Sequence, residues 1–438
     1  MKEQNKIPTS KVQRAAKLFT TGAKVGSNYV KYYAKKAVGN EHAKEELDEA
    51  NAEDIYSSLS ELKGSALKVA QIMSMDKNMM PQAMQDKFSL AQYSAPPLSY
   101  PLVVKTFRQH FGKGPTEIFD TFTKNAVNAA SIGQVHKATK GDLMLAVKVQ
   151  YPGVADSVKS DLKMVKPIAM KMLGLKENEV QQYFEEVETK LLEETDYDFE
   201  LKQSIEIAEA SADLEGFVFP KYYPEFSCKR ILTMDWIDGK HMKEYLATNP
   251  SQTERNAIGQ KLWNLYDFQV NNIRAIHADP HPGNFIIKED GNIGLIDFGC
   301  VKRIPEDFYQ MYFQLLNSKM INDNEKLRDL FFKLEFIFKD EPKTSQDMFF
   351  DVFKDFMSLL IKPFVTDTFD FSDKKYFDDL FAMGEDLKTR KDLRKNGVAR
   401  GSRHILYINR TYFGLFALLH DLGATISTKT SFNFELSN

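Results

Sequence analysis

The stretch HADPHPGN at residues 277–284 is followed by LIDFG at residues 295–299, and these two stretches decide the fold. Between them, short apolar runs stand on either side of a turn at Asp290-Gly291. Apolar runs of this length around an Asp-Gly turn predict two short paired strands. We therefore expect both stretches to lie on loops at the ends of short strands.

Three polar residues in these stretches have the identity, order and spacing that phosphoryl transfer requires. The reaction needs a carboxylate that orients or deprotonates the acceptor, and oxygen ligands for the Mg²⁺ that bridges the phosphates. In protein kinases an HxD aspartate does the first task, while a following asparagine and the DFG aspartate do the second. We predict that Asp279 is the catalytic carboxylate and that Asn284 and Asp297 bind Mg²⁺ and the nucleotide.

The histidines of the first stretch leave a second interpretation open. A His-x-Asp-x-His pattern such as His277 to His281 can ligate a transition metal through its imidazoles. The asparagine and the DFG sequence that follow favour phosphoryl transfer instead. In that interpretation His277 supports the loop, and His281 supports it or contacts phosphate.

Lys148 is the candidate phosphate-binding lysine, because it stands between apolar neighbours in AVKV at residues 146–149. The apolar runs at 127–138 and 143–150, with a Lys140-Gly141-Asp142 turn between them, predict a β-hairpin. Kinases use a lysine on such a strand to pair with phosphate oxygens and with a helix glutamate. We predict this role for Lys148.

The glycine-rich phosphate loop of kinases is replaced by NAASIGQVH at residues 128–136. Alanine disfavours positive φ, so this loop should be stiffer than a glycine-rich one, although its N–H groups can still face an anion. We predict that Ala129, Ala130 and Ser131 contact the nucleotide. Met234, at the expected hinge between two lobes, is predicted to contact it as well.

Strands are predicted early and helices late in the chain, which indicates an α+β, two-lobed protein-kinase-like fold with an N-terminal helical extension. The expected elements include strands at residues 217–222 and 230–237 and a long helix at 253–276. The predicted domains are a basic N-terminal segment at 1–45, a helical extension at 46–115, an N-lobe at 116–235 with a helical insertion at about 156–200, and a helical C-lobe at 236–438.

The N-terminal segment is basic, since residues 5–40 contain lysines and an arginine but no acidic residue. A basic helix with aromatic residues can lie on an anionic membrane or contact an acidic partner. The alternative is a helix that packs on the domain by its apolar side and keeps its polar face in water. We hypothesise reversible binding to a peripheral anionic membrane surface.

Composition argues against several other classes of protein. The net charge of −3 over 438 residues is not that of a nucleic-acid-binding protein, so no nucleic-acid partner is expected. Cys228 and Cys300 are far apart and form no CxxC pair, which fits a reducing, cytoplasmic location. No apolar run is long enough to span a bilayer, so no transmembrane helix is expected.

Taken together, SIGQVH at 131–136, AVKVQYPGV at 146–154, DPHPGN at 279–284 and the DFG sequence resemble the UbiB/AarF family of atypical kinases. The family's KxGQ motif corresponds here to Lys68 and Gln71, with Ala70 in place of the glycine, and the first alanine of its loop is Asn128 here.

By the same resemblance, Glu194 and Asp196 are the family's ExD element, and Glu200 is the helix glutamate that pairs with Lys148. The resemblance implies that the extension helices pack over the region where a protein substrate would bind. We hypothesise that Lys68 and Gln71 face the nucleotide and restrain protein-substrate access. In agreement, no Ala-Pro-Glu sequence or activation segment follows residues 297–299.

The family's cofactors are ATP or ADP with Mg²⁺, and its members support quinone and other isoprenoid-lipid metabolism. The expected partners are therefore a nucleotide, an isoprenoid lipid and lipid-biosynthesis enzymes. One alternative is a small-molecule phosphotransferase like the aminoglycoside and choline kinases, which share the H-x-D-x-x-x-x-N loop. Another is a pseudokinase that presents lipids or scaffolds enzymes when a nucleotide binds.

Overall fold

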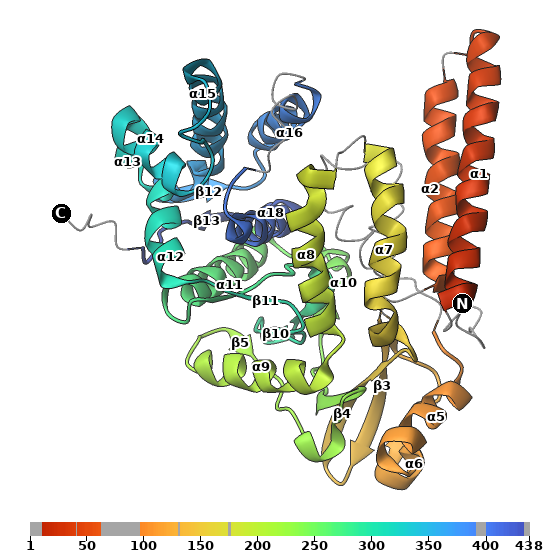
Figure 1. Cartoon of the computed structure of the whole chain (residues 1–438). Helices are drawn as coiled ribbons and strands as arrows, with labels where there is room; N and C mark the ends of the chain where they lie inside the picture. The colour runs from red at the N-terminus through yellow and green to blue at the C-terminus, as the bar shows by residue number, and fades with distance from the viewer. Residues whose placement is uncertain are drawn as a thin grey trace. The chain divides into compact units, whose positions relative to one another are not determined.

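The computed structural model of the chain describes residues 11–40, 42–62, 97–129, 132–173, 177–390 and 400–432. The chain divides into two compact units: Met1–Ile205 with Lys221–Trp236, and Glu206–Pro220 with Ile237–Asn438. Both units combine helices with short strands, so the fold is α+β (Figure 1). Four predicted site residues lie outside the described residues, namely Lys68, Gln71, Ala130 and Ser131.

The first unit is built on an antiparallel sheet in which β4 (Leu143–Gln150) lies between β3 (Gly133–Lys140) and β6 (Ile231–Asp235). β3 and β4 form the predicted hairpin, and Gly141 in its turn has φ +56, which glycine adopts without a Cβ penalty. Because β4 is a central strand, its last six residues are buried. The short strands β1 (Thr121–Phe122) and β2 (Asn128–Ala129) both pair with β3.

Helix α5 (Tyr100–Phe111) packs against this sheet. A proline stands in its first turn, where a missing N–H does no harm, and Gly112 ends it at φ +71. The short helix α6 (Pro115–Ile118) leads from α5 into β1, and the turn η1 (Pro224–Phe226) precedes β6. The buried core between α5 and the sheet includes Val103, Phe107, Phe119, Phe122, Val147 and Ile231.

The first unit also contains longer helices, which precede β1 or lie between β4 and β6 in the sequence. Figure 1 shows α1 beside α2 and α7 beside α8. Their bounds are α1 (Lys11–Ala37), α2 (Ala43–Leu62), α7 (Val154–Leu173), α8 (Glu177–Glu194) and α9 (Tyr197–Ala210), of which α9 ends within the second unit. The contact of α1 with α2 is polar, since the Asn28 amide donates to Asn51 over 3.2 Å and to Asp54 over 3.0 Å.

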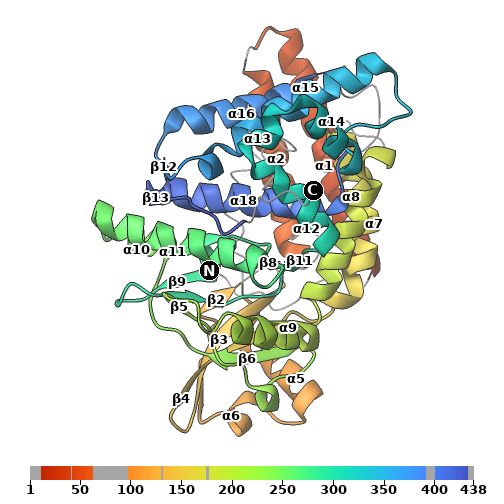
Figure 2. The same cartoon turned by 90° about the vertical axis from the view of Figure 1, so that its left-hand side faces the viewer.

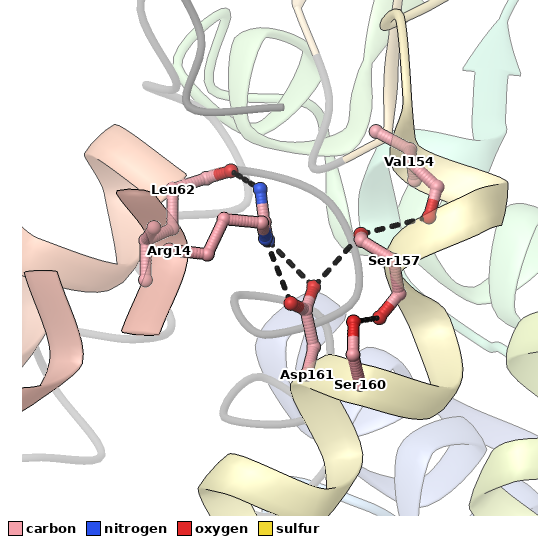
Figure 3. A network of polar contacts seen from close by, with 6 residues as sticks. All are labelled: Arg14, Leu62, Val154, Ser157, Ser160 and Asp161. Atoms are coloured by element: carbon pink, nitrogen blue, oxygen red, sulfur yellow. Dashed lines mark hydrogen bonds and ion pairs between the residues drawn. The ribbon is translucent and has the colours of Figure 1, made fainter. Parts of the chain in front are cut away.

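A buried ion pair joins α1 to α7 (Figure 3). Arg14 and Asp161 are 2% and 0% exposed, and the guanidinium donates to both carboxylate oxygens over 2.7 and 2.5 Å. A third donor of Arg14 reaches the carbonyl of Leu62, the last residue of α2, over 2.8 Å. Ser157 also donates to Asp161 over 2.9 Å. One guanidinium therefore holds three helices together.

The second unit carries small sheets. β10 (Ile293–Leu295) lies between β5 (Phe217–Val218) and β9 (Phe285–Ile287), and β9 also pairs with β7 (Lys240–His241). β8 (Ala275–His277) pairs with β11 (Val301–Arg303), and β12 (Thr368–Asp370) pairs with β13 (Thr425–Ser427). The helical elements of this unit are α10 (Met242–Leu246), α11 (Gln252–Asn271), η2 (Pro282–Asn284), α12 (Glu306–Tyr312), η3 (Phe313–Leu316), α13 (Ser318–Asn322), α14 (Asn324–Lys333), α15 (Lys343–Leu360), η4 (Lys362–Val365), α16 (Lys374–Thr389) and α18 (Arg403–Leu422).

The strand predicted at residues 217–222 is divided between the two units. Before Pro220, β5 pairs in parallel with β10 of the second unit. After it, Tyr222 forms an isolated bridge with Met234 of the first unit. Proline has no N–H to give to a ladder, so the run cannot continue as one strand. The prediction of a single strand here is wrong for that reason.

The helix predicted at residues 253–276 is shorter than expected. α11 ends at Asn271, and residues 275–277 form β8 instead. Arg274 has φ +50, which reverses the chain, and its guanidinium donates to the Val270 and Asn271 carbonyls at the helix end. Side-chain donors of this kind satisfy the last carbonyls of a helix. Strand β8 then leads directly into the first motif.

Helix α18 runs alongside α11 (Figure 2). A Cβ on Gly259 of α11 would lie 3.2 Å from the Leu419 side chain of α18, so glycine permits the close approach. Leu415, Phe416 and Leu419 are each at most 1% exposed. No helix among the described residues is long and apolar enough to cross a membrane.

We predict that Arg14→Met opens the contact of α1 and α2 with α7. The substitution removes the cation beside the buried Asp161, and breaking a buried pair costs about 3 kcal/mol or more. Amide hydrogen exchange in α1, α2 and α7 should accelerate by roughly a hundredfold, because exchange from locally opened states follows the free energy of opening. Exchange in α18 should not change.

The matched control is Lys24→Met, which removes an exposed cation that pairs with the half-buried Asp54. Exposed pairs contribute about 0 to 1 kcal/mol, so exchange should stay near that of the wild type. Equal exchange in the two variants would contradict the assignment of Arg14 as the contact that joins these helices.

Candidate active site

Lys148 and Glu200 form the ion pair that the sequence led us to expect, within the first unit. The Lys148 ammonium lies 2.8 Å from the Glu200 carboxylate, and the two side chains are 9% and 2% exposed. Lys148 is buried because β4 has a neighbour on each side, and a buried ammonium needs a charged partner. The Lys148 ammonium also lies 5.2 Å from the centre of the Tyr197 ring.

The end of β4 fixes the position of α9, which carries Glu200. Gln150, the last residue of β4, donates to the Thr195 carbonyl over 3.0 Å. Arg230 donates to the same carbonyl over 3.0 Å and to the Gln150 side chain over 2.6 Å. These bonds tie the junction of α8 and α9 to the strand that carries Lys148.

The expected ExD element lies at this junction. The Asp196 carboxylate accepts from the N–H groups of Asp198 and Phe199 over 3.2 and 3.3 Å, so Asp196 caps the first turn of α9. Glu194 is half-buried at the end of α8. The roles of both residues toward a nucleotide stay predictions, as does that of the KxGQ-like motif.

The described part of the alanine-rich loop is held close to α9. Ala129 is half-buried in β2, opposite Gln134. A Cβ on Gly133 would lie 2.8 Å from the Tyr197 hydroxyl and 2.9 Å from the Val149 carbonyl. Glycine is therefore required at residue 133, because a side chain there would push the loop away from the helix that carries Glu200.

Gln134 and His136 form a contact that the sequence did not reveal. The Gln134 amide oxygen accepts from the Leu98 N–H over 2.6 Å, which fastens the segment before α5 to β3. Its amide nitrogen bonds to His136, whose other ring nitrogen bonds to the Thr123 carbonyl over 2.7 Å. Burial lowers the pKa of His136 to about 4, so the ring is neutral at pH 7. The SIGQVH pattern is the signal that could have indicated this structural role.

Met234 lies on β6 opposite Ala146 and is 6% exposed. Asp235, next to it, accepts a hydrogen bond from the Tyr223 hydroxyl over 2.7 Å. The first unit ends at Trp236, immediately after this strand. Met234 thus lies where the expected hinge begins, and its contact with a nucleotide stays a prediction.

In the second unit, Asp279 and Asn284 are joined within one loop. The Asn284 amide nitrogen donates to the Asp279 carbonyl over 2.9 Å, and the His281 N–H donates to the same carbonyl over 2.6 Å. His281 in turn accepts at Nδ1 from the Gly283 N–H over 3.0 Å. The loop is closed on itself, so the side chains of Asp279 and Asn284 have defined directions.

His277 connects this loop to Asp297. Its Nε2 lies 2.9 Å from the Asp297 carbonyl and must donate, since a carbonyl only accepts. Its Nδ1 is then the acceptor for the Tyr266 hydroxyl at 3.4 Å. Burial lowers the pKa of His277, and the ring is 1% exposed. Both ring nitrogens are thus engaged in supporting the loop, as the phosphoryl-transfer interpretation expects.

The DFG sequence is fixed by packing and by its own backbone. The Asp297 carboxylate accepts from the Gly299 N–H over 2.8 Å. Phe298 is fully buried, with its ring centre 6.1 Å from those of His277 and Phe219. The Ile296 N–H donates to the Asn284 carbonyl over 3.2 Å. The two expected metal ligands, Asn284 and Asp297, therefore stand on neighbouring hydrogen-bonded segments.

This donor set fits a magnesium ion. Because Asn284 uses its amide nitrogen for the Asp279 carbonyl, its side-chain oxygen is turned toward other partners. An amide oxygen and the Asp297 carboxylate are the hard oxygen ligands that Mg²⁺ prefers, so these two residues would hold the ion. Among the described residues, no group of three or more His, Cys, Asp or Glu side chains is placed to hold a metal ion.

Asp279 has a partner that the sequence did not indicate. The guanidinium of Arg410, on α18, lies 3.0 Å from one Asp279 carboxylate oxygen. The two side chains are 14% and 18% exposed. The partners are 131 residues apart, and no motif surrounds Arg410 to signal the contact.

A family model described as "ABC1 atypical kinase-like domain" matches residues 90–331, which is more than half of the chain. The atypical kinase COQ8, mitochondrial, of Saccharomyces cerevisiae is 26% identical over 97% of this chain and 84% of its own length. The probable serine/threonine-protein kinase abkA of Dictyostelium discoideum is 26% identical over 78% of this chain. The match spans 65% of the Dictyostelium protein, slightly less than two thirds of it.

Among solved structures, the complex of Rv3197 with erythromycin from Mycobacterium tuberculosis is similar with a TM-score of 0.59 and 26% identity. The match covers 89% of this chain and 96% of that chain. The kinase-like α+β fold predicted from the sequence is confirmed by these matches. The chain belongs to the ABC1 atypical kinase-like family, which is the UbiB/AarF family that its motifs resemble.

Proposed function

We propose that the protein binds Mg²⁺ and ATP and transfers or hydrolyses the terminal phosphoryl group. The observation that carries the proposal is the loop of the second unit, where hydrogen bonds join Asp279, Asn284 and the segment of Asp297. Phosphoryl transfer depends on positioning and charge stabilisation. These three residues would supply the metal ligands and the carboxylate that meets the acceptor. When bound, Mg²⁺ would neutralise charge that develops on the phosphates.

The residues of the two units would have different tasks toward the nucleotide. Asn284 and Asp297 would bind the metal, and Asp279 would orient or deprotonate the acceptor. Lys148 would bind phosphate oxygens, with Glu200 holding its ammonium in place as the 2.8 Å pair indicates. Electrostatic stabilisation is strongest when the charged groups are held before the reaction begins.

We further propose that the protein supports quinone or other isoprenoid-lipid metabolism, as its family implies. Supporting this, β11 and α12 follow the DFG sequence directly, leaving little chain for a peptide-binding activation segment. A small-molecule phosphotransferase and a nucleotide-gated scaffold for lipid enzymes remain the alternatives. ATP hydrolysis measured with and without an isoprenoid lipid separates the three, because each predicts a different dependence on lipid.

The N-terminal helix supports a location at a membrane surface. Among the described side chains of α1 the buried ones are polar, with Arg14, Thr21 and Asn28 at most 8% exposed. On the opposite face Phe19, Val30 and Tyr33 are 80%, 71% and 64% exposed, and we name these three residues the outer stripe. A helix with this inverted pattern presents its apolar face outward.

An anionic lipid surface is the occupant that fits the outer stripe. Lys31 and Lys36 of α1 are exposed, so the helix offers cations together with the apolar side chains. Inserting large apolar side chains contributes about 1.5 to 3 kcal/mol each, whereas each lysine contributes about 1 kcal/mol near an anionic surface. We therefore propose that the stripe supplies most of the affinity and the lysines the preference for anionic lipid. A cytoplasmic location stays a prediction.

Asp297→Asn should reduce Mg²⁺-dependent ATP turnover by roughly a hundredfold or more, because it removes the charged ligand of the metal. Asn284→Ala should act in the same direction, with a smaller effect. Steady-state phosphate release is the measurement. Asp290→Asn is the control, since Asp290 lies in the exposed turn between β9 and β10. Turnover within a few-fold of wild type for Asp297→Asn would remove Asp297 from the site.

Lys148→Met should weaken binding of Mg²⁺ and ATP by roughly tenfold to a hundredfold, because a hydrogen bond from a charged group contributes about 1.5 to 3 kcal/mol. Calorimetric titration measures the dissociation constant. The double variant Lys148→Met/Glu200→Gln avoids a buried, uncompensated carboxylate and should bind ATP as weakly as the single variant. Lys140→Met, at an exposed pair with Asp120, is the control. Unchanged affinity in both Lys148 variants would contradict the assignment.

The triple variant Phe19→Ser/Val30→Ser/Tyr33→Ser should lower binding to anionic vesicles by roughly a hundredfold or more, because it removes the apolar contacts of the outer stripe. Vesicle sedimentation gives the partition coefficient. Val365→Ser is the control, because Val365 is 45% exposed and lies in the second unit. Equal binding of the wild type to neutral and anionic vesicles would rule out the proposal. The proposal would also be ruled out if the triple variant bound vesicles like the wild type, or if the substitutions changed only the self-association of the protein.

A further inference from the structure

The C-terminal helix α18 contacts the loop of Asp279 at two successive turns. Arg410 bonds to the Asp279 carboxylate over 3.0 Å. Four residues later, a Cβ on Gly414 would lie 2.2 Å from Cγ of Pro280. Residues four apart share one face of a helix, so Arg410 and Gly414 face the loop together. Glycine at 414 lets the proline approach the helix backbone, which brings the guanidinium within reach of the carboxylate.

The position of α18 is itself determined by burial. Leu415 and Phe416 are at most 1% exposed, and Thr411 is fully buried with its hydroxyl bonded to the Tyr407 carbonyl over 2.7 Å. A helix with this much core contact does not move as a loose segment. The guanidinium that meets Asp279 is thus presented from a rigid element, outside the region that the family model matches at residues 90–331.

Asp279 is held at both its backbone and its side chain. Its carbonyl accepts from Asn284 and from the His281 N–H, and one carboxylate oxygen accepts from Arg410. Arginine is always protonated, and its planar donors restrict the orientation of a carboxylate more strongly than a lysine does. A carboxylate that must direct an acceptor needs such a restriction, because small displacements of a catalytic group reduce the rate steeply.

We propose that Arg410 is a positioning residue for Asp279, so that α18 forms part of the active site. Arg410 fixes the carboxylate in the direction from which it meets the phosphoryl acceptor, and it keeps the negative charge of Asp279 in place. The inference rests on the proposed phosphoryl transfer. It adds a residue that orients Asp279 toward the phosphoryl acceptor. The roles proposed for the metal ligands and for Lys148 do not change.

The position of Arg410 implies a specific kinetic signature. Because the residue acts through Asp279, Arg410→Ala should lower kcat by roughly tenfold to a hundredfold. The KM for Mg²⁺-ATP should stay within about twofold, since nucleotide-binding groups are unchanged. Arg410→Lys keeps the charge but loses the fixed direction of the guanidinium N–H, so its kcat should lie between those of Arg410→Ala and wild type. Millimolar guanidinium chloride should restore part of the kcat of Arg410→Ala.

The matched control is Arg400→Ala. Arg400 forms a comparable, partly buried pair with Glu341 in the same unit, with side chains 7% and 15% exposed. Its loss should lower thermal stability without selectively lowering kcat, and guanidinium should not raise the kcat of this variant. Thermal unfolding and circular dichroism of all three variants show which of them fold.

The outcomes separate this inference from the proposed function. If the wild type turns over ATP and Arg410→Ala has the same kcat, the inference is overturned while the proposed function stands. The inference would also be overturned by an Arg410→Ala that unfolds while Arg410→Lys keeps full kcat, or by equal kcat losses in the Arg400 and Arg410 variants. An Mg²⁺-ATP thermal shift should persist in Arg410→Ala and be lost in Asp297→Asn. Wild-type protein without Mg²⁺-dependent turnover would overturn the proposed function and this inference with it.

Discussion

The pairing of buried charges is the constraint on which the arrangement of this protein depends. Removing one partner of a buried pair costs about 3 to 5 kcal/mol, so a buried cation and its carboxylate hold their two segments together. Arg14 with Asp161 and Lys148 with Glu200 are buried pairs, and Arg410 with Asp279 is a partly buried one. The three pairs join segments 147, 52 and 131 residues apart. Each pair therefore connects a helix to another element of its own unit, and two of the three involve predicted site residues.

Neutral polar side chains orient the segments that carry the predicted site residues. Burial lowers the pKa values of His136 and His277, so both rings are neutral and each nitrogen has one role as donor or acceptor. His277 thereby links the loop of Asp279 to the backbone of Asp297, and His136 supports Gln134 in its bonds to Leu98. His136 and His277 therefore support the segments that carry the predicted site residues.

Much of the fold could be predicted because its signals are local. The hairpin of β3 and β4 follows from two apolar runs around Gly141, and the strands β9 and β10 follow from the Asp290-Gly291 turn. Two predicted elements were wrong because a single residue interrupts the pattern that predicted each of them. Pro220 divides the strand predicted at 217–222 between two units, and Arg274 ends α11 through a positive φ and bonds to the helix end. Propensity averaged over a window does not resolve either effect.

By itself, the sequence determined which residues are candidates for the chemistry: Asp279, Asn284 and Asp297 stand within one short stretch, and their order and spacing predict phosphoryl transfer. The family resemblance added Glu200 as the partner of Lys148, and the structure places the two in an ion pair. Only the tertiary structure decided that Arg410 meets Asp279 and that Arg14 meets Asp161. An arginine can pair with any carboxylate, so its partner depends on which surfaces the apolar core brings together. Packing over more than a hundred residues makes that choice, and no local pattern in the sequence records it.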